Sequence, residues 1–445
     1  MTRVTRFGVV ALALGLTAAC GTRQPKSEAP PPAPVAPSGG ECAAPAIGEN
    51  VAITSAIGEA SSPVVAFDGE MFRLAWWDMR GEFPAVSTVR VDRAGVKSGD
   101  PWTPAHKAAA RDQTVAVDSA EGHLVWLDAG AVMSARLRDG AEPPVSFAKQ
   151  ATFAAAGPRG AVVWVDQGVL YFRADGMLPP PDRHGVVVEP PPVAVFGGGI
   201  EDPRIAWNGE RYAIVWSSSV PGGRNIMLQR MSNRGVRLGE PMTVSHVAGV
   251  SRSPEIVALG TGFAVVWTNA APEDQNPRDR YRIFFATVGE KGDAPTSTRQ
   301  LEFNGSADHV AIAAAGAECG IAWVGSVDPQ GSAVFFARLD ATGKPLGPTL
   351  HVSDGWPLTC GRPSLAFSGD GYGVAWHDDR DETGNKIMFS FLSCNPPAES
   401  ADAGVPPSQG IVVDAPPAPP TADAPKDAKD TKDAKDSPKL KKLFQ

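Results

Sequence analysis

The sequence predicts an all-β fold made of seven copies of a four-stranded unit, and three observations support this. A tryptophan recurs in similar segments such as AVVWVD, AIVWSS and GVAWHD. A glycine stands seven residues before the tryptophan in most copies. No stretch keeps an apolar period of 3.6 residues, so helix is expected to be nearly absent. The repeat tryptophans are Trp76, Trp126, Trp164, Trp216, Trp267, Trp323 and Trp376.

Each copy has the signature of four short strands. PSLAFSG followed by YGVAWHD gives two apolar runs joined at a glycine turn, which predicts a hairpin. A third run such as NIMLQRM follows, and then a turn containing a glycine and a fourth run such as MTVSH. Units of about 50 residues with four strands each, repeated around a ring, are typical of a β-propeller.

The two ends of the repeat region complement each other. The seventh copy stops after its third strand, at Cys394, and lacks a fourth. Residues 48–54 (GENVAIT) parallel the fourth-strand segment 239–245 (GEPMTVS). We therefore predict a seven-bladed β-propeller over residues 42–394, closed by the N-terminal strand, which completes the last blade. Closure removes the exposed sheet edges that an open array would leave.

The N-terminus has the pattern of an export signal. Arg3 and Arg6 precede an apolar run that is too short to span a bilayer. The ending TAAC at Cys20 resembles the lipobox of bacterial lipoproteins, although Leu16 stands four rather than three residues before the cysteine. The resemblance implies removal of residues 1–19 and acylation of Cys20. Ordinary signal cleavage is the alternative.

Two further segments flank the propeller. Residues 20–41 form a Pro-rich linker after the lipidated cysteine, and residues 395–445 form a Pro-, Ala-, Lys- and Asp-rich tail that we expect to be disordered. The net charge of −8 argues against binding to nucleic acid. By the lipoprotein resemblance, Gly21 after the cysteine implies an exported protein anchored in the outer membrane, on an undetermined side.

Lipidation leaves four cysteines, for which three connectivities exist. Cys394 ends the third strand of the last copy, and Cys42 shortly precedes the strand expected beside it. Both fall at one end of an antiparallel pair, so a disulfide between them is predicted. Pairing of Cys319 with Cys360 follows only by elimination. Four unpaired thiols are the alternative.

Acidic and basic side chains gather after the second strands of the first and last copies, which are neighbours in a closed ring. These loops define a candidate ligand face. The acidic loop of the seventh copy offers oxygens for Ca²⁺, but the spacing does not match an EF-hand loop, so neither metal nor cofactor is expected. An aspartate after a strand is also a common turn residue. The candidate residues are Asp78, Arg80, Asp378, Arg380, Asp381 and Glu382.

The repeats PRIAWNGERYAIVW and PSLAFSGDGYGVAWHDDR resemble those of uncharacterised bacterial exported propellers with W-x-D-x-R motifs. The resemblance covers residues 48–394 and implies a fold more than an activity. We expect a non-catalytic scaffold at the cell envelope that binds a protein or glycan partner. A glycoside-active enzyme, hydrolase or lyase, is the alternative, and two carboxylates clustered at the propeller mouth would favour it.

Lipidation has a direct test. If Cys20 is acylated, the mature protein partitions into detergent and carries a blocked N-terminal cysteine, whereas Cys20→Ala abolishes that partitioning. Phase separation and mass spectrometry of the mature N-terminus measure both. A soluble wild-type protein whose mature chain begins elsewhere contradicts the prediction.

Overall fold

We analysed a computed structural model of the chain, which describes residues 42–394 apart from several short segments. The described residues contain strands and turns and no α-helix. Residues 1–41 and 395–445, which include Cys20, the linker and the tail, lie outside the described residues. The internal segments left out are 43–44, 56–59, 81–83, 104–109, 117–121, 138–144, 147–149, 176–191, 273–280, 291–294, 297, 304–305, 328–330, 354–360 and 380–383.

The strands form antiparallel sheets in chain order. The first three sheets are β3 (Ala60–Phe67), β4 (Phe72–Asp78), β5 (Ala85–Val91) and β6 (Lys97–Trp102); β7 (Ala110–Ala116), β8 (His123–Asp128), β9 (Ala131–Arg136) and β10 (Val145–Ser146); and β11 (Ala151–Gly157), β12 (Ala161–Asp166), β13 (Val169–Arg173) and β14 (Val193–Gly197).

The second half of the chain repeats the pattern. An eight-stranded sheet comprises two four-stranded halves, joined by a single parallel pairing of Arg224 with Val250. Its halves are β15 (Ile200–Trp207), β16 (Arg211–Val220), β17 (Gly223–Ser232) and β18 (Arg237–Thr243), and β19 (Val250–Leu259), β20 (Gly262–Ala270), β21 (Tyr281–Val288) and β22 (Arg299–Gln300). The next sheet is β23 (Ser306–Ala315), β24 (Glu318–Val327), β25 (Gly331–Leu339) and β26 (Leu350–His351).

The last sheet joins the two ends of the described region. It contains β27 (Ser364–Phe367), β28 (Gly371–Asp378) and β29 (Lys386–Ser393). The N-terminal strands β1 (Ala46–Ile47) and β2 (Val51–Ala52) pair antiparallel with β29, as the sequence predicts for the closing strand. Backbone hydrogen bonds from Gly48 to Phe391 and from Ile53 to Ile387 extend this pairing.

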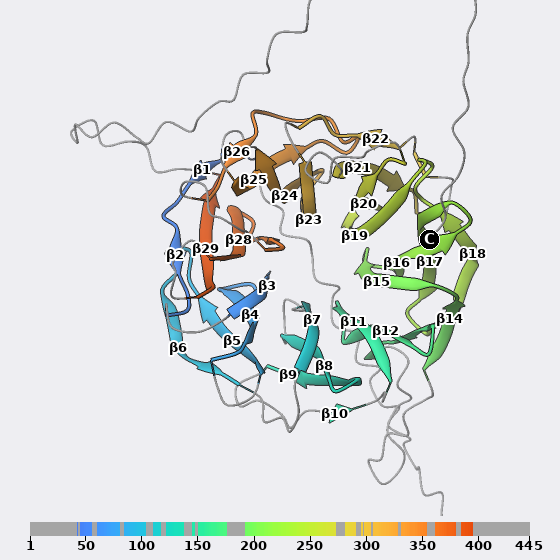
Figure 1. The fold of residues 1–445 in the computed structure, drawn as a ribbon, viewed down its shortest axis with the longest axis horizontal. Coiled ribbons are helices and arrows are strands. Elements are labelled where there is room, and N and C mark those ends of the chain that lie inside the picture. Colours follow the sequence, from blue (N-terminus) through green and yellow to red (C-terminus); the bar gives the residue numbers. More distant parts are fainter. Residues whose placement is uncertain are drawn as a thin grey trace, which may run out of the picture.

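The sheets are arranged radially, so the fold is all-β and propeller-like (Figure 1). The first strand of each four-stranded unit lies innermost. These strands contact one another in chain order from β3 to β27, and β27 contacts β3 in turn. The centre of the molecule is therefore bounded by strands from every part of the repeat region.

The repeat tryptophans build the core between sheets. All seven are buried, with exposed fractions of 2% or less. Their neighbours are apolar residues of the same and of the adjoining sheet: Trp376, for example, lies in one cluster with Leu392 of its own sheet and Phe336 of the sheet before it. Large aromatic side chains contribute strongly to core stability, so the fixed register of the tryptophans has a packing explanation.

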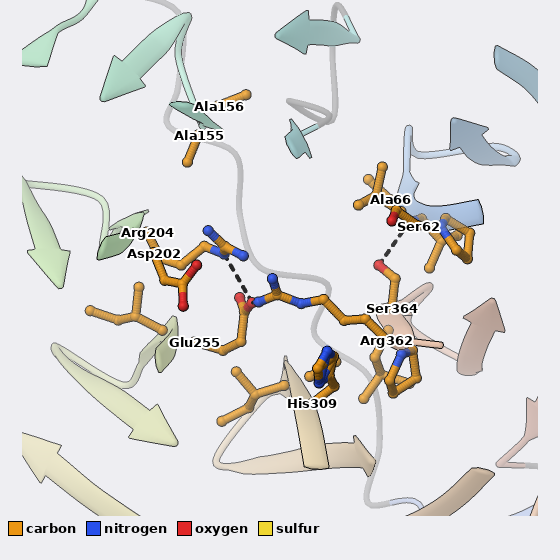
Figure 2. Close-up of a pocket in the computed structure, with 18 of the residues that line it drawn as sticks. Ser62, Ala66, Ala155, Ala156, Asp202, Arg204, Glu255, His309, Arg362 and Ser364 are labelled. Atoms are coloured by element: carbon orange, nitrogen blue, oxygen red, sulfur yellow. Dashed lines mark hydrogen bonds and ion pairs between the residues drawn. The ribbon is translucent and has the colours of Figure 1, made fainter. Parts of the chain in front are cut away.

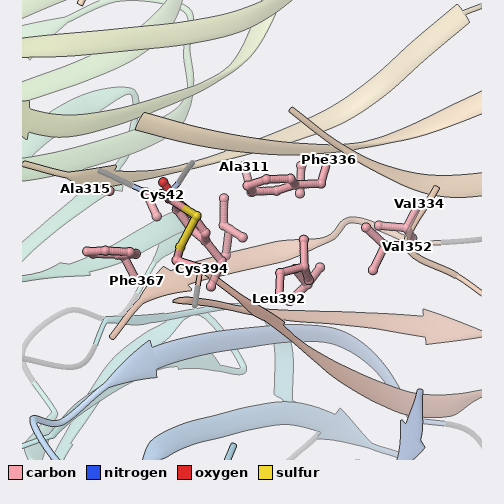
Figure 3. Packing of buried hydrophobic residues seen from close by; sticks show 14 of the residues in the cluster. Cys42, Ala311, Ala315, Val334, Phe336, Val352, Phe367, Leu392 and Cys394 are labelled. Carbon is pink, nitrogen blue, oxygen red and sulfur yellow. A yellow bond between two sulfur atoms is a disulfide. The ribbon is translucent and has the colours of Figure 1, made fainter. Parts of the chain in front are cut away.

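The predicted cysteine pair Cys42–Cys394 is bonded in the structure, with Cα atoms 4.6 Å apart (Figure 3). The bond lies among buried residues of the last two sheets, including Phe367 and Leu392. The second predicted pair is not formed, since Cys319 is a free, buried thiol, while Cys360 lies outside the described residues. Cys319 packs in the core of its own sheet, where burial raises its pKa to about 12.

The disulfide should stabilise the last sheet and its pairing with the N-terminal strands. It links residues 352 positions apart, so it restricts a very large loop in the unfolded chain, an effect of about 2–4 kcal/mol. Reductant should therefore lower the melting temperature of the wild-type protein. In the double variant Cys42→Ala/Cys394→Ala, melting should be lower from the start and insensitive to reductant. An unchanged wild-type melting temperature in reductant contradicts this role.

Candidate functional site

A cavity of about 590 Å³ lies at the centre, between the innermost strands (Figure 2). Its walls come from β3, β11, β15, β19, β23 and β27 and from the residues just before β27. This volume lies within the range of small-molecule sites. This central cavity is our candidate site.

A repeated backbone feature occurs at four positions, three of which (Ser62, Asp202 and His309) line this cavity. Ser62, Asp202, Ser253 and His309 stand fourteen residues before their repeat tryptophans, and their φ angles lie between 49° and 51°. That left-handed conformation is costly for residues with a Cβ and is often found at functional sites. The strand register shifts at each of these points, as in a β-bulge, which re-aims a side chain. Arg362 occupies the corresponding position before β27.

The polar part of the cavity centres on Glu255. Arg204 donates from Nε to Glu255 Oε1 at 2.9 Å, and Arg362 donates from Nη2 to the same oxygen. The three residues come from β15, β19 and the segment before β27, so Arg362 reaches across the cavity to its partner (Figure 2). Asp202 adds a second carboxylate, with Ser253 Oγ 3.5 Å from its Oδ2.

Arg362 is deep in the molecule but faces open space. Burial lowers the pKa of its guanidinium, and the nearby Arg204 acts in the same direction, whereas Glu255 and Asp202 oppose the shift. Nevertheless, 29% of its side chain is exposed. The exposed part faces the cavity, because Arg362 belongs to the cavity wall.

Two histidines lie in the same wall. Burial lowers the pKa of His309; Arg362 and Arg252 lower it further, while Asp308 and Asp202 oppose them. Burial also lowers the pKa of His377, with His309 acting in the same direction. A Cβ at position 361 would lie 1.4 Å from His377 Cε1, so only glycine lets the imidazole occupy this place.

The opposite side of the cavity is apolar. Residues 153–156 of β11 and 64–66 of β3 contribute small and aliphatic side chains and the ring of Phe153. The figure places Ala155 and Ala156 across the cavity from His309 (Figure 2). The site thus offers charged groups on one side and an apolar surface on the other.

The predicted ligand face has a different environment. Asp78 is buried and accepts hydrogen bonds from Trp76 Nε1, the Arg80 guanidinium and Ser87 Oγ. Burial alone raises the pKa of Asp78, but the hydrogen bonds from Arg80 outweigh it and leave that pKa below its usual value. Asp378 is also buried, with 3% exposed. Both aspartates lie at the ends of second strands, away from the cavity wall. Arg380, Asp381 and Glu382 lie outside the described residues.

The sequence analysis did not identify the cavity residues. Four prolines stand thirteen residues before their tryptophans, and three of the residues that precede them, Ser62, Asp202 and Arg362, line the cavity. The signal that identifies these positions is their change of residue type at a fixed register, from serine to aspartate to arginine. Among the described residues, no group of three or more His, Cys, Asp or Glu side chains is arranged to hold a metal ion.

Comparison with known proteins places the chain in no family. No family model and no curated protein matches it. Similar solved structures include a protein of unknown function from Dyadobacter fermentans, at 14% identity and TM-score 0.48, covering 78% of this chain and 99% of that one. Kuenenia stuttgartiensis hydrazine synthase matches at 13% identity and TM-score 0.48, and the match covers 75% of this chain and 97% of that one. The catalytic domain of a Coprinopsis cinerea GH62 alpha-L-arabinofuranosidase matches at 11% identity and TM-score 0.36, and the match covers 78% of this chain and 95% of that one. At these TM-scores we draw no inference about activity.

The described residues include no helix of the length and apolar character needed to cross a membrane.

The histidines predict a pH dependence of stability. Because the pKa values of His309 and His377 are lowered in the folded state, the unfolded chain takes up protons first below about pH 6.5. Stability should therefore fall between about pH 7.5 and pH 5, above the range where carboxylates titrate. The variant His309→Asn/His377→Gln should show a smaller fall in melting temperature. His246→Gln, at an exposed histidine, is the matched control and should behave as wild type. An equal fall in the double variant contradicts the assignment.

Proposed function

We propose that the sheets form a closed seven-bladed β-propeller. Six blades correspond to the four-stranded units that begin at β3, β7, β11, β15, β19 and β23. The seventh consists of β27, β28 and β29 with β1 and β2 at its outer edge. The contact of β27 with β3 supports closure between the last blade and the first.

We propose further that this propeller is the ligand-binding part of an exported lipoprotein, held at the outer membrane through Cys20 and the linker, and that it does not catalyse a reaction. The observation that supports binding is the central cavity, where bulges of separate strands bring charged side chains together. Glu255 is held by two guanidinium groups. A carboxylate held in this way is poorly placed to exchange protons with a substrate, which favours recognition over acid–base chemistry.

The second candidate, a glycoside-active enzyme, has one observation in its favour. Asp202 and Glu255 come from neighbouring innermost strands and line the same cavity. Paired carboxylates are the usual catalytic groups of glycoside hydrolases. Of the two, only Asp202 is without an arginine hydrogen bond among the described residues, so it would be the acid or base in such a reaction.

Binding and turnover can be separated with one pair of variants. The full mature protein is screened against glycan and peptide arrays, and any bound glycan is then assayed for release of reducing ends. We expect binding without product release, and we expect Arg362→Met to weaken binding roughly tenfold or more.

The outcomes discriminate between the two functions. Release of product by wild type, abolished by Asp202→Asn while binding persists, establishes the enzyme instead. If the Arg362→Met variant binds every ligand that the wild type binds, this contradicts ligand binding at the central cavity. Arg93→Met removes an arginine that pairs with Asp370 away from the cavity and serves as the control.

A further inference from the structure

The guanidinium groups in the cavity have unused hydrogen-bonding capacity. Arg362 donates only from Nη2, and Arg204 donates from Nε to Glu255 and from Nη1 to the Pro203 carbonyl. Within the described part of the chain, Nε and Nη1 of Arg362 and Nη2 of Arg204 have no acceptor. Both arginines line the cavity, so these N–H groups can donate to a ligand that enters it.

The charge of the site limits what that acceptor can be. Asp202 and Glu255 balance Arg204 and Arg362, and the lowered pKa values of the two histidines leave them neutral near pH 7. A ligand with one negative charge adds a single charge to a balanced site. A dianion would be repelled by both resident carboxylates, and a cation offers no acceptor to the guanidinium edges.

The geometry of the ligand's negatively charged group also matters. The free donors stand on two guanidinium groups that meet at Glu255, so the two oxygens of a carboxylate can each accept a charge-assisted hydrogen bond from a different arginine. Asp202 lines the same cavity, and Ser253 Oγ lies 3.5 Å from its Oδ2. It can therefore accept a hydrogen bond from a hydroxyl group of the same ligand.

We propose that the central cavity binds a small hydroxy-carboxylate, with its carboxylate on the free edges of Arg362 and Arg204, its hydroxyl group on Asp202 and its apolar part against Phe153 and Ala155. This inference rests on the proposed function in one respect, that the cavity is the ligand site. It adds the chemical class of the ligand and the role of each wall.

The test uses a series of 2-hydroxy acids with side chains from methyl to phenyl, each matched with its amide and its deoxy acid. Binding to the full mature protein is measured by ligand-observed NMR and calorimetry. We expect the hydroxy acids to bind, the amides to lose roughly tenfold or more in affinity, and the deoxy acids to fall between them. Arg362→Met should abolish the preference for acid over amide. Asp202→Asn should reduce the difference between hydroxy and deoxy acids.

Several results would overturn the inference. These are equal binding of acids and amides, an unchanged acid preference in Arg362→Met, or no binding by any acid in the series. A neutral glycan that binds in the cavity while every acid fails would refute the carboxylate but leave the proposed binding function standing. Arg93→Met, with its melting temperature checked alongside that of Arg362→Met, controls for the general loss of an arginine–carboxylate pair.

Discussion

The contact between the first and last sheets is the constraint on which the central site depends. The backbone amide of Val65 in β3 donates to Ser364 Oγ in β27 at 2.9 Å, directly between two parts of the cavity wall. The outer edge of the last sheet is held by β1 and β2 and by the bond between Cys42 and Cys394. If this junction opened, Arg362 would move with the last sheet and leave Glu255. Residues 42–52 and 386–394, at the two ends of the described region, thus support the wall of the central cavity.

The left-handed bulges show how a repeated strand supplies different chemistry at each copy. The backbone conformation is nearly the same at Ser62, Asp202, Ser253 and His309, although it is unfavourable for each of them. A conserved geometry of this kind directs whichever side chain is present toward the centre. The residue type at this backbone position differs between copies, so the chemistry offered to a ligand can vary without changing the packing that stabilises the sheets. The tryptophans have the opposite pattern, since their type is constant and their role is packing.

The sequence predicted the structure well at features that repeat from copy to copy, and predicted it poorly at positions where the residue type varies. The tryptophan register predicted the strand order, and the incomplete last copy predicted which N-terminal segment pairs with β29. The disulfide followed from that pairing, because it placed Cys42 and Cys394 at one end of two adjacent strands. Pairing Cys319 by elimination failed because a small buried thiol is stable in an apolar core without a partner.

The central site could not be predicted from the sequence, and the reason is physical. Arg204, Glu255 and Arg362 are separated by 51 and 107 residues along the chain, and only the radial arrangement of the sheets brings them together. The motif W-x-D-x-R drew attention to Asp78 instead, because recurrence is easier to recognise than spatial convergence. The structure shows that Asp78 is satisfied by its own neighbours, with Trp76, Arg80 and Ser87 as donors. A carboxylate with its acceptors occupied organises a strand end, whereas guanidinium edges that face a cavity without acceptors favour a ligand. Unsatisfied capacity, rather than the recurrence of a motif, is therefore the better guide to the site in this protein.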